Sequence, residues 1–105
     1  MIYFDSAATS FQKPASVAAA MWEALASMSS PGRGGYPAAA RAADTAFQCR
    51  SELAELFGLK NPEQVVFTLN ATHALNIAIK SLVPPEGKVV VSGYEHNAVT
   101  RPLHA

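Results

Sequence analysis

Apolar side chains recur every three or four residues near the start of the chain, which is the spacing of one face of an α-helix. The residues in this repeat are Val17, Met21, Leu25 and Met28. The pattern predicts a helix that opens at Pro14 or Ala15. The run SSPGRGG, residues 29–35, contains a proline and three glycines and is expected to end this helix.

A second helix is predicted from near Pro37 to Gly58, because proline is favoured in the first helical turn and glycine just past the last one. Its apolar face is formed by Ala46, Cys49, Leu53 and Leu56. Cys49 is the single cysteine of the chain and has no histidine near it in the sequence. We therefore predict that Cys49 is a buried, inert core thiol and not a nucleophile.

Two short apolar runs in the C-terminal half, residues 65–68 and 88–92, are predicted strands. A helix that begins around Thr72 separates them, and another helix is predicted from about Asn97 to the last residue, Ala105. Strands joined through a helix pair in parallel with a right-handed crossover, so we predict an α/β fold. Two strands leave both sheet edges exposed. We therefore expect the chain to be the beginning of a larger α/β domain with an incomplete sheet.

The composition narrows the class of protein. Half of the 105 residues are apolar, and eight Lys and Arg balance eight Asp and Glu, as in soluble globular proteins. The sequence has no basic run of the kind that binds nucleic acid, and no apolar stretch approaches the ~18 residues of a membrane span. The first residues lack the basic start of a signal peptide. A single cysteine agrees with a reducing compartment, and we expect a cytoplasmic protein.

Chemistry is expected where each predicted strand leads into a helix, because ligands of open α/β sheets bind at the carboxyl ends of the strands. After the first strand, Asn70 and Ala71 are small, and Thr72 can serve as N-cap or first-turn residue of a helix whose free N–H groups attract a phosphate. An ordinary capped helix without a ligand fits this pattern too. After the second strand, His96 can stack on a flat ring, act as an acid or base, or bond to a loop.

Other polar residues are weaker candidates. His73, Asn76 and Lys80 share the polar face of their helix, which favours solvation or a local bond. Arg33, on the glycine-rich loop, can reach an anion, although a surface arginine is the default interpretation. Histidine, cysteine and carboxylate residues do not recur at metal-ligand spacing, so no metal site is expected. The glycine motifs of phosphate loops and dinucleotide sites are missing from the sequence.

Five short motifs follow one another along nearly the whole chain: DSAATS, KP, SPGRGG, NATHALN and YEHNAV. In this order and spacing they resemble the N-terminal part of the cysteine desulfurase and selenocysteine lyase family, within the class V aminotransferases of fold type I. The resemblance implies a pyridoxal 5′-phosphate cofactor. It assigns the phosphate to Ala71 and Thr72, and it assigns His96 to stacking on the pyridine ring, with an acid or base role open.

The same resemblance puts the DSAAT stretch, with Ala7 and Ala8, near the active-site entrance, and we add Arg33 as a candidate for the substrate entrance. Two positions depart from the pattern of the family. His73 stands where a glutamate is common, and Tyr36 stands where the PGRGG stretch is often followed by histidine. The first change is modest on a polar helix face, and the second bears on substrate preference.

The chemistry implied by the resemblance is sulfur transfer from L-cysteine, which gives alanine and a persulfide on an enzyme cysteine. The family's cofactor-binding lysine and sulfur-accepting cysteine match no residue here, so we expect the chain alone to be inactive. By the same resemblance, residues 1–36 form an N-terminal segment and residues 37–105 begin the cofactor-binding large domain. A homodimer is expected for the complete protein.

Three alternatives stay open at this stage. The first is another class V aminotransferase or a selenocysteine lyase. The second is a non-catalytic module whose exposed strand edges pair with a partner chain. The third is a generic domain for a phosphate-bearing ligand without recognition of a ring.

Overall fold

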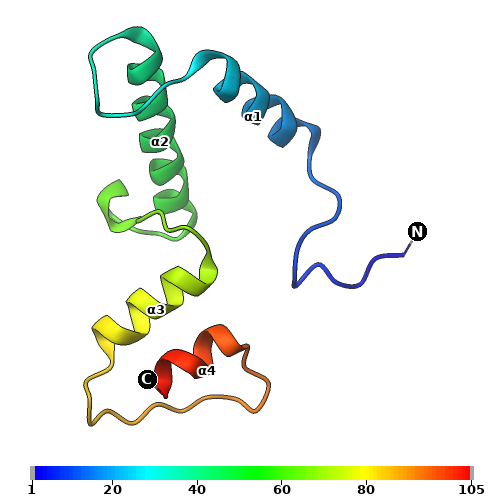
Figure 1. The fold of residues 1–105 in the computed structure, drawn as a ribbon, viewed down its shortest axis with the longest axis vertical. Coiled ribbons are helices and arrows are strands. Elements are labelled where there is room, and N and C mark those ends of the chain that lie inside the picture. Colours follow the sequence, from blue (N-terminus) through cyan, green and yellow to red (C-terminus); the bar gives the residue numbers. More distant parts are fainter. Residues whose placement is uncertain (1, 105) are drawn as a thin grey trace. The chain divides into compact units, whose positions relative to one another are not determined.

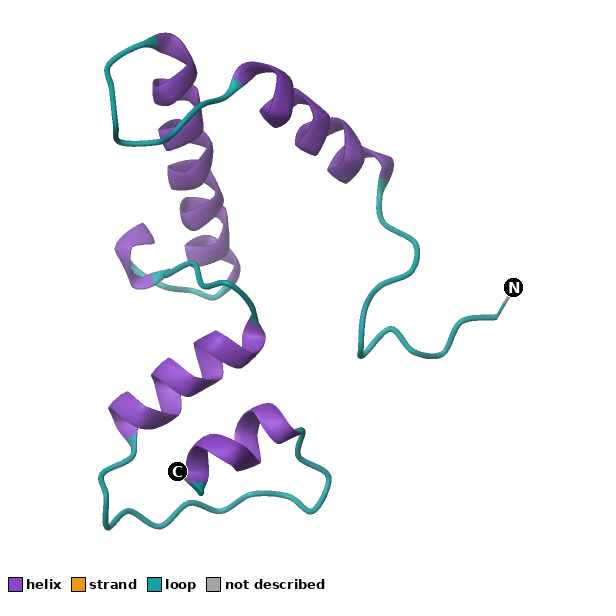
Figure 2. Cartoon of the chain, viewed as in Figure 1, coloured by secondary structure: helices purple, strands orange, loops and turns teal. Residues whose placement is uncertain are grey.

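The computed structural model describes residues 2–104, and they group into two compact units, Met1–Val65 and Val66–Ala105 (Figure 1). We call these the N-terminal unit and the C-terminal unit. Figure 2 shows that helices and loops make up both of them. The helical elements are α1 (Ala15–Ser27), α2 (Pro37–Leu56), the short 3-10 helix η1 (Pro62–Gln64), α3 (Ala71–Leu82) and α4 (Asn97–Leu103). The predicted division at residue 36 stays a prediction.

Helix α1 begins directly after Pro14, as the sequence predicts, and ends where the N–H of Met28 donates to the carbonyl of Ala24. Its predicted apolar face is present but uncovered. Met21 is 63% exposed and Leu25 is 80% exposed, and α1 contains no buried residue. The helical periodicity is therefore confirmed, whereas most of this face is exposed among the described residues.

Helix α2 also has the predicted ends. Pro37 is its first residue, and Gly58 follows it with φ +64°, a left-handed conformation that glycine adopts without strain. There the N–H of Gly58 donates to the carbonyl of Glu55, and the N–H of Leu59 donates to the carbonyl of Ala54 at 2.8 Å. The chain thus turns back, and η1 packs against α2.

The covered side of α2 differs from the predicted one. Its two buried residues are Ala39 and Ala54, and Cys49 is exposed. At ~100° per residue, Cys49 lies roughly 140° around the helix from Ala54. The prediction of a buried thiol is therefore wrong: the turn after Gly58 folds back near Ala54, and Cys49 lies on an exposed part of the helix.

Replacing Gly58 with alanine is expected to destabilise the N-terminal unit by about 1 kcal/mol, because a Cβ disfavours positive φ. An added Cβ would meet no atom within 4 Å at Gly58, so the cost is conformational and not steric. Gly35→Ala is the matched control, since Gly35 has equally open surroundings and no positive φ. Urea unfolding followed by helical circular dichroism measures both variants. Equal stability of the two would contradict the assigned backbone conformation.

In the C-terminal unit, the predicted helix around Thr72 is present as α3, and α3 packs beside α4 (Figure 1). The predicted strands at residues 65–68 and 88–92 are not formed: within residues 2–104 neither segment belongs to a sheet. A strand requires a hydrogen-bonded partner, and residues 88–91 make no backbone hydrogen bond to any described residue. The helical part of the α/β prediction is therefore observed, and the parallel sheet is not.

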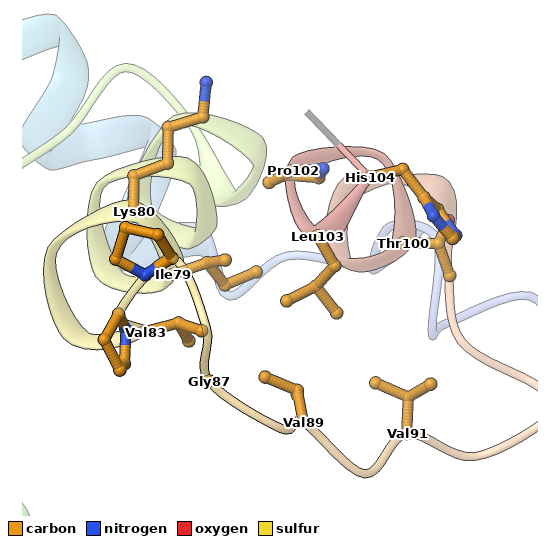
Figure 3. A pocket seen from close by; sticks show the side chains of 12 residues that line it. Ile79, Lys80, Val83, Gly87, Val89, Val91, Thr100, Pro102, Leu103 and His104 are labelled. Atoms are coloured by element: carbon orange, nitrogen blue, oxygen red, sulfur yellow. The ribbon is translucent and has the colours of Figure 1, made fainter.

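One feature of a strand persists in residues 88–91. Val89 is 44% exposed, Val90 98% and Val91 45%, so successive side chains alternate between a sheltered side and solvent. Figure 3 shows Val89 and Val91 both pointing toward Leu103 of α4. This alternation is the period of two residues that defines a β-strand. The segment is patterned as a strand whose sheltered side faces α4.

Helix α4 begins at Asn97 as predicted but ends at Leu103. His104 caps it, with its N–H donating to the carbonyl of Arg101. The predicted continuation past Leu103 is therefore wrong at His104, and Ala105 lies outside the described residues. The searched helices, all within residues 2–104, are too short or too polar to cross a bilayer.

Candidate functional site

The N-terminus of α3 leaves backbone donors available for a ligand. Asn70 is the N-cap, and its side-chain oxygen accepts from the N–H of His73 at 2.9 Å. Thr72 is therefore a first-turn residue and not the cap, which decides between the two predicted roles. The N–H groups of Ala71 and Thr72 and the Thr72 hydroxyl make no hydrogen bond to another described residue. Such donors at a helix N-terminus attract an anion.

Two local bonds fix the polar side of this first turn. The Asn76 amide donates to the carbonyl of Thr72 at 2.9 Å. The Leu69 N–H approaches Nδ1 of His73 at 3.5 Å, a long contact. His73 therefore makes the local interaction that the sequence favoured, and Asn76 is held one turn below Thr72.

His96 is held at the start of α4. It is the N-cap residue, and its Nδ1 accepts from the N–H of Ala98 at 3.1 Å. Ala98 is buried, with 9% exposure, so this hydrogen bond is partly shielded from water. The preceding loop is closed by the Ser92 hydroxyl, which donates to the Glu95 carboxylate at 2.8 Å. The imidazole thus has a defined orientation.

A cavity of about 510 Å³ lies between α3 and α4 and includes both predicted residues, Thr72 and His96. This volume falls in the range of ~300–1,000 Å³ that is usual for small-molecule sites. All ionisable groups in its lining are basic, so its potential favours an anion. The full lining is Thr72, Asn76, Lys80, His96, Asn97, Ala98, Arg101 and Pro102.

Sequence reasoning missed the lower part of this cavity. Thr72, Asn76 and Lys80 are spaced four residues apart and so form one line along α3, and Arg101 follows Asn97 by one turn of α4. This spacing of four was a readable signal. The polar helix face that includes Asn76 and Lys80 equally fits solvation or a local bond, so the pattern alone does not assign these residues to a site.

A second hollow, of about 710 Å³, is larger (Figure 3). It lies among the end of α3, residues 84–91 and the end of α4, and Val83, Val89, Val91 and Leu103 contribute to its lining. It contains neither Thr72 nor His96. We take the smaller cavity as the candidate site, because it brings Thr72 and His96 together.

The remaining predicted residues belong to the N-terminal unit. Ala7 and Ala8 lie on a turn in which the N–H of Ala8 donates to the Asp5 carbonyl at 3.1 Å. The Tyr3 hydroxyl lies 2.7 Å from the Thr9 carbonyl and closes this turn. The role of Ala7 and Ala8 at a substrate entrance stays a prediction.

Arg33 lies on an exposed loop whose ends are joined. The Ser29 and Tyr36 hydroxyls are 2.7 Å apart, and the N–H of Ser29 donates to the carbonyl of Ala38. The Arg33 side chain makes no hydrogen bond or ion pair with another described residue. Its guanidinium is therefore available to an anion, and its role at the entrance also stays a prediction. Within the described part of the chain, histidine, cysteine and carboxylate side chains form no group of three that could hold a metal ion.

Residues 2–105 match the family model described as Aminotransferase class-V, a match that extends over both units of the chain. The chain belongs to the class V aminotransferase family. Membership implies fold type I and places the chain among enzymes that generally depend on pyridoxal phosphate. It also agrees with the motifs from DSAATS to YEHNAV, so the recognised family is confirmed.

Two curated proteins are similar to this class V aminotransferase chain. A selenocysteine lyase from Homo sapiens is 36% identical over 85 residues, which are 78% of this chain and 18% of that protein. A probable cysteine desulfurase from Synechocystis sp. is 32% identical over 82 residues, 77% of this chain and 19% of that protein. The chain thus spans about a fifth of the length of these relatives. No solved structure matches it.

Proposed function

We propose that this chain supplies the phosphate- and ring-binding part of the cofactor site of a cysteine desulfurase-like enzyme. The observation that carries the proposal is the shared cavity: Thr72 and His96 follow two different predicted strands, yet they line one hollow in the C-terminal unit. A phosphate donor set and a flat ring in one cavity suit a ligand that has both a phosphate and an aromatic ring.

The residues present fit pyridoxal 5′-phosphate. The unbonded N–H groups of Ala71 and Thr72 and the Thr72 hydroxyl are donors of the type that binds a phosphate. The His96 imidazole offers a ring face for stacking, and the basic lining matches the anionic charge of the cofactor. When bound, this cofactor withdraws electrons from an attached amino acid. The part of Thr72 and His96 is to bind and orient it.

The proposed reaction of the complete protein is transfer of sulfur from L-cysteine to an enzyme thiol, which yields alanine and a persulfide. The carbon–sulfur bond of the substrate breaks, and a sulfur–sulfur bond forms on the enzyme. The proton lost by the enzyme thiol is matched by the proton that the substrate Cβ gains in alanine. The names of the two relatives support a sulfur or selenium amino acid as substrate. Selenocysteine lyase is the alternative activity, and a cytoplasmic homodimer is part of the same proposal.

Titration of the ¹⁵N-labelled chain with pyridoxine 5′-phosphate tests the cofactor site. This analogue has no aldehyde, so it does not react with surface lysines such as Lys60 or Lys88. We expect chemical-shift changes at the backbone amides of Ala71 and Thr72 and at the His96 ring. Inorganic phosphate alone should shift the α3 amides and leave the His96 ring unchanged.

Two outcomes would contradict the proposal. If the analogue shifts neither Thr72 nor His96, the cavity does not bind the cofactor. If inorganic phosphate binds as tightly as the analogue, the generic phosphate-binding alternative is favoured, since the ring then adds no affinity.

A further inference from the structure

The hydrogen bond at the start of α4 restricts what His96 can do. Nδ1 of His96 accepts from the N–H of Ala98, so the lone pair of this nitrogen is already used. A neutral imidazole has one N–H and one acceptor nitrogen. With Nδ1 as the acceptor, the proton resides on Nε2.

The other ring nitrogen is available to a ligand. His96 lines the cavity between α3 and α4, and Nε2 makes no hydrogen bond to another described residue. We infer that the neutral ring of His96 is a hydrogen-bond donor through Nε2 and is held in this tautomer by its own capping bond. This inference narrows the roles that the sequence left open, and it rests on the proposed cofactor site only for the identity of the ligand.

The same hydrogen bond fixes the orientation of the His96 ring. Helix α4 has seven residues, and among the described side chains His96 alone caps its N-terminus. The ring is therefore tied at Cβ and at Nδ1, which leaves little rotational freedom. A ring fixed against the packed α3–α4 pair presents its face and its Nε2–H in a constant relation to Thr72.

The tautomer can be measured on the unmodified 105-residue chain. Long-range ¹H–¹⁵N spectra of the histidine rings are recorded at about pH 8.5, at which histidine side chains in peptides are neutral. The His96 signals are assigned by their loss in His96→Asn. We expect a protonated Nε2 and an unprotonated Nδ1. A predominant Nδ1–H form, or an even mixture of the two tautomers, would overturn the inference.

Matched variants separate the cap from the ring. His96→Asn keeps an acceptor at the N-cap and removes the ring, whereas His96→Phe keeps a flat ring and removes the acceptor. Hydrogen exchange at the Ala98 amide should stay near the native rate in the first variant and become about fivefold faster in the second, as expected for a lost N-cap. His104→Asn, at the far end of α4, should leave the exchange rate unchanged.

Binding of pyridoxine 5′-phosphate to the same variants tests the positioning role. We expect His96→Phe to bind more weakly than the native chain although it keeps an aromatic ring. Native affinity in His96→Phe would overturn the positioning role. If neither the native chain nor any variant binds the analogue, the proposed function fails, while the tautomer and the Ala98 exchange rate still decide the inference.

Discussion

Replacing Thr72 with alanine is expected to weaken binding of pyridoxine 5′-phosphate by about tenfold, because a hydrogen bond to a charged group contributes about 1.5 kcal/mol or more. The Thr72 hydroxyl makes no hydrogen bond to another residue within 2–104 and lies in the first turn of α3. Its removal takes one donor from the phosphate site without disturbing the cap, which Asn70 provides.

Two comparisons make this result specific. Thr72→Ser keeps the hydroxyl and should bind the analogue within about twofold of the native chain, a difference of less than 0.5 kcal/mol. Pyridoxine, which has no phosphate, should bind Thr72→Ala with an affinity within about twofold of that of the native chain. Isothermal calorimetry measures all five affinities: those of the native chain and both variants for the analogue, and those of the native chain and Thr72→Ala for pyridoxine. Equal losses for the phosphorylated and unphosphorylated ligands would show that Thr72 does not bind the phosphate.

Replacing Ala54 with aspartate is expected to destabilise the N-terminal unit by about 3 kcal/mol, because a buried carboxylate loses its hydration. Ala54 is 4% exposed in α2, in the part of the chain that η1 folds against. An aspartate there also lies near the C-terminus of α2, where the helix dipole disfavours a negative charge.

Leu56→Asp is the matched control for this variant. Leu56 lies two residues further along α2, near the same negative helix end, but it is 74% exposed. Its replacement should cost less than about 1 kcal/mol, as surface substitutions usually do. Hydrogen exchange of the α2 amides and urea unfolding measure both variants. Equal losses would mean that η1 does not shelter Ala54 in solution.

The helices could be predicted because their signals are local. Pro37 and Gly58 mark the two ends of α2 through their own backbone preferences, and Pro14 does the same for the start of α1. For Thr72, the sequence left two roles at the start of α3 open: the N-cap and a residue of the first turn. The competition between Asn70 and Thr72 for the cap depends on side-chain geometry that the sequence does not specify.

The strands and the buried side of α2 could be predicted less well than the helices, because both depend on residues that are distant in sequence. A run such as residues 88–92 has strand composition, but pairing requires a partner of suitable register. Cys49 lies on the most apolar side of α2, yet the chain after Gly58 folds over Ala54. Local pattern thus assigns the helix, and tertiary contacts decide which of its sides is covered.

The valine segment at residues 88–91 also bears on how the chain behaves as its concentration rises. It combines strong β-propensity with backbone groups that bond to no described residue, and such an edge is a template for strands of other molecules. Its N-terminal residue, Lys88, contributes the charge that slows edge-to-edge assembly. Self-association through this segment is therefore expected to increase with protein concentration.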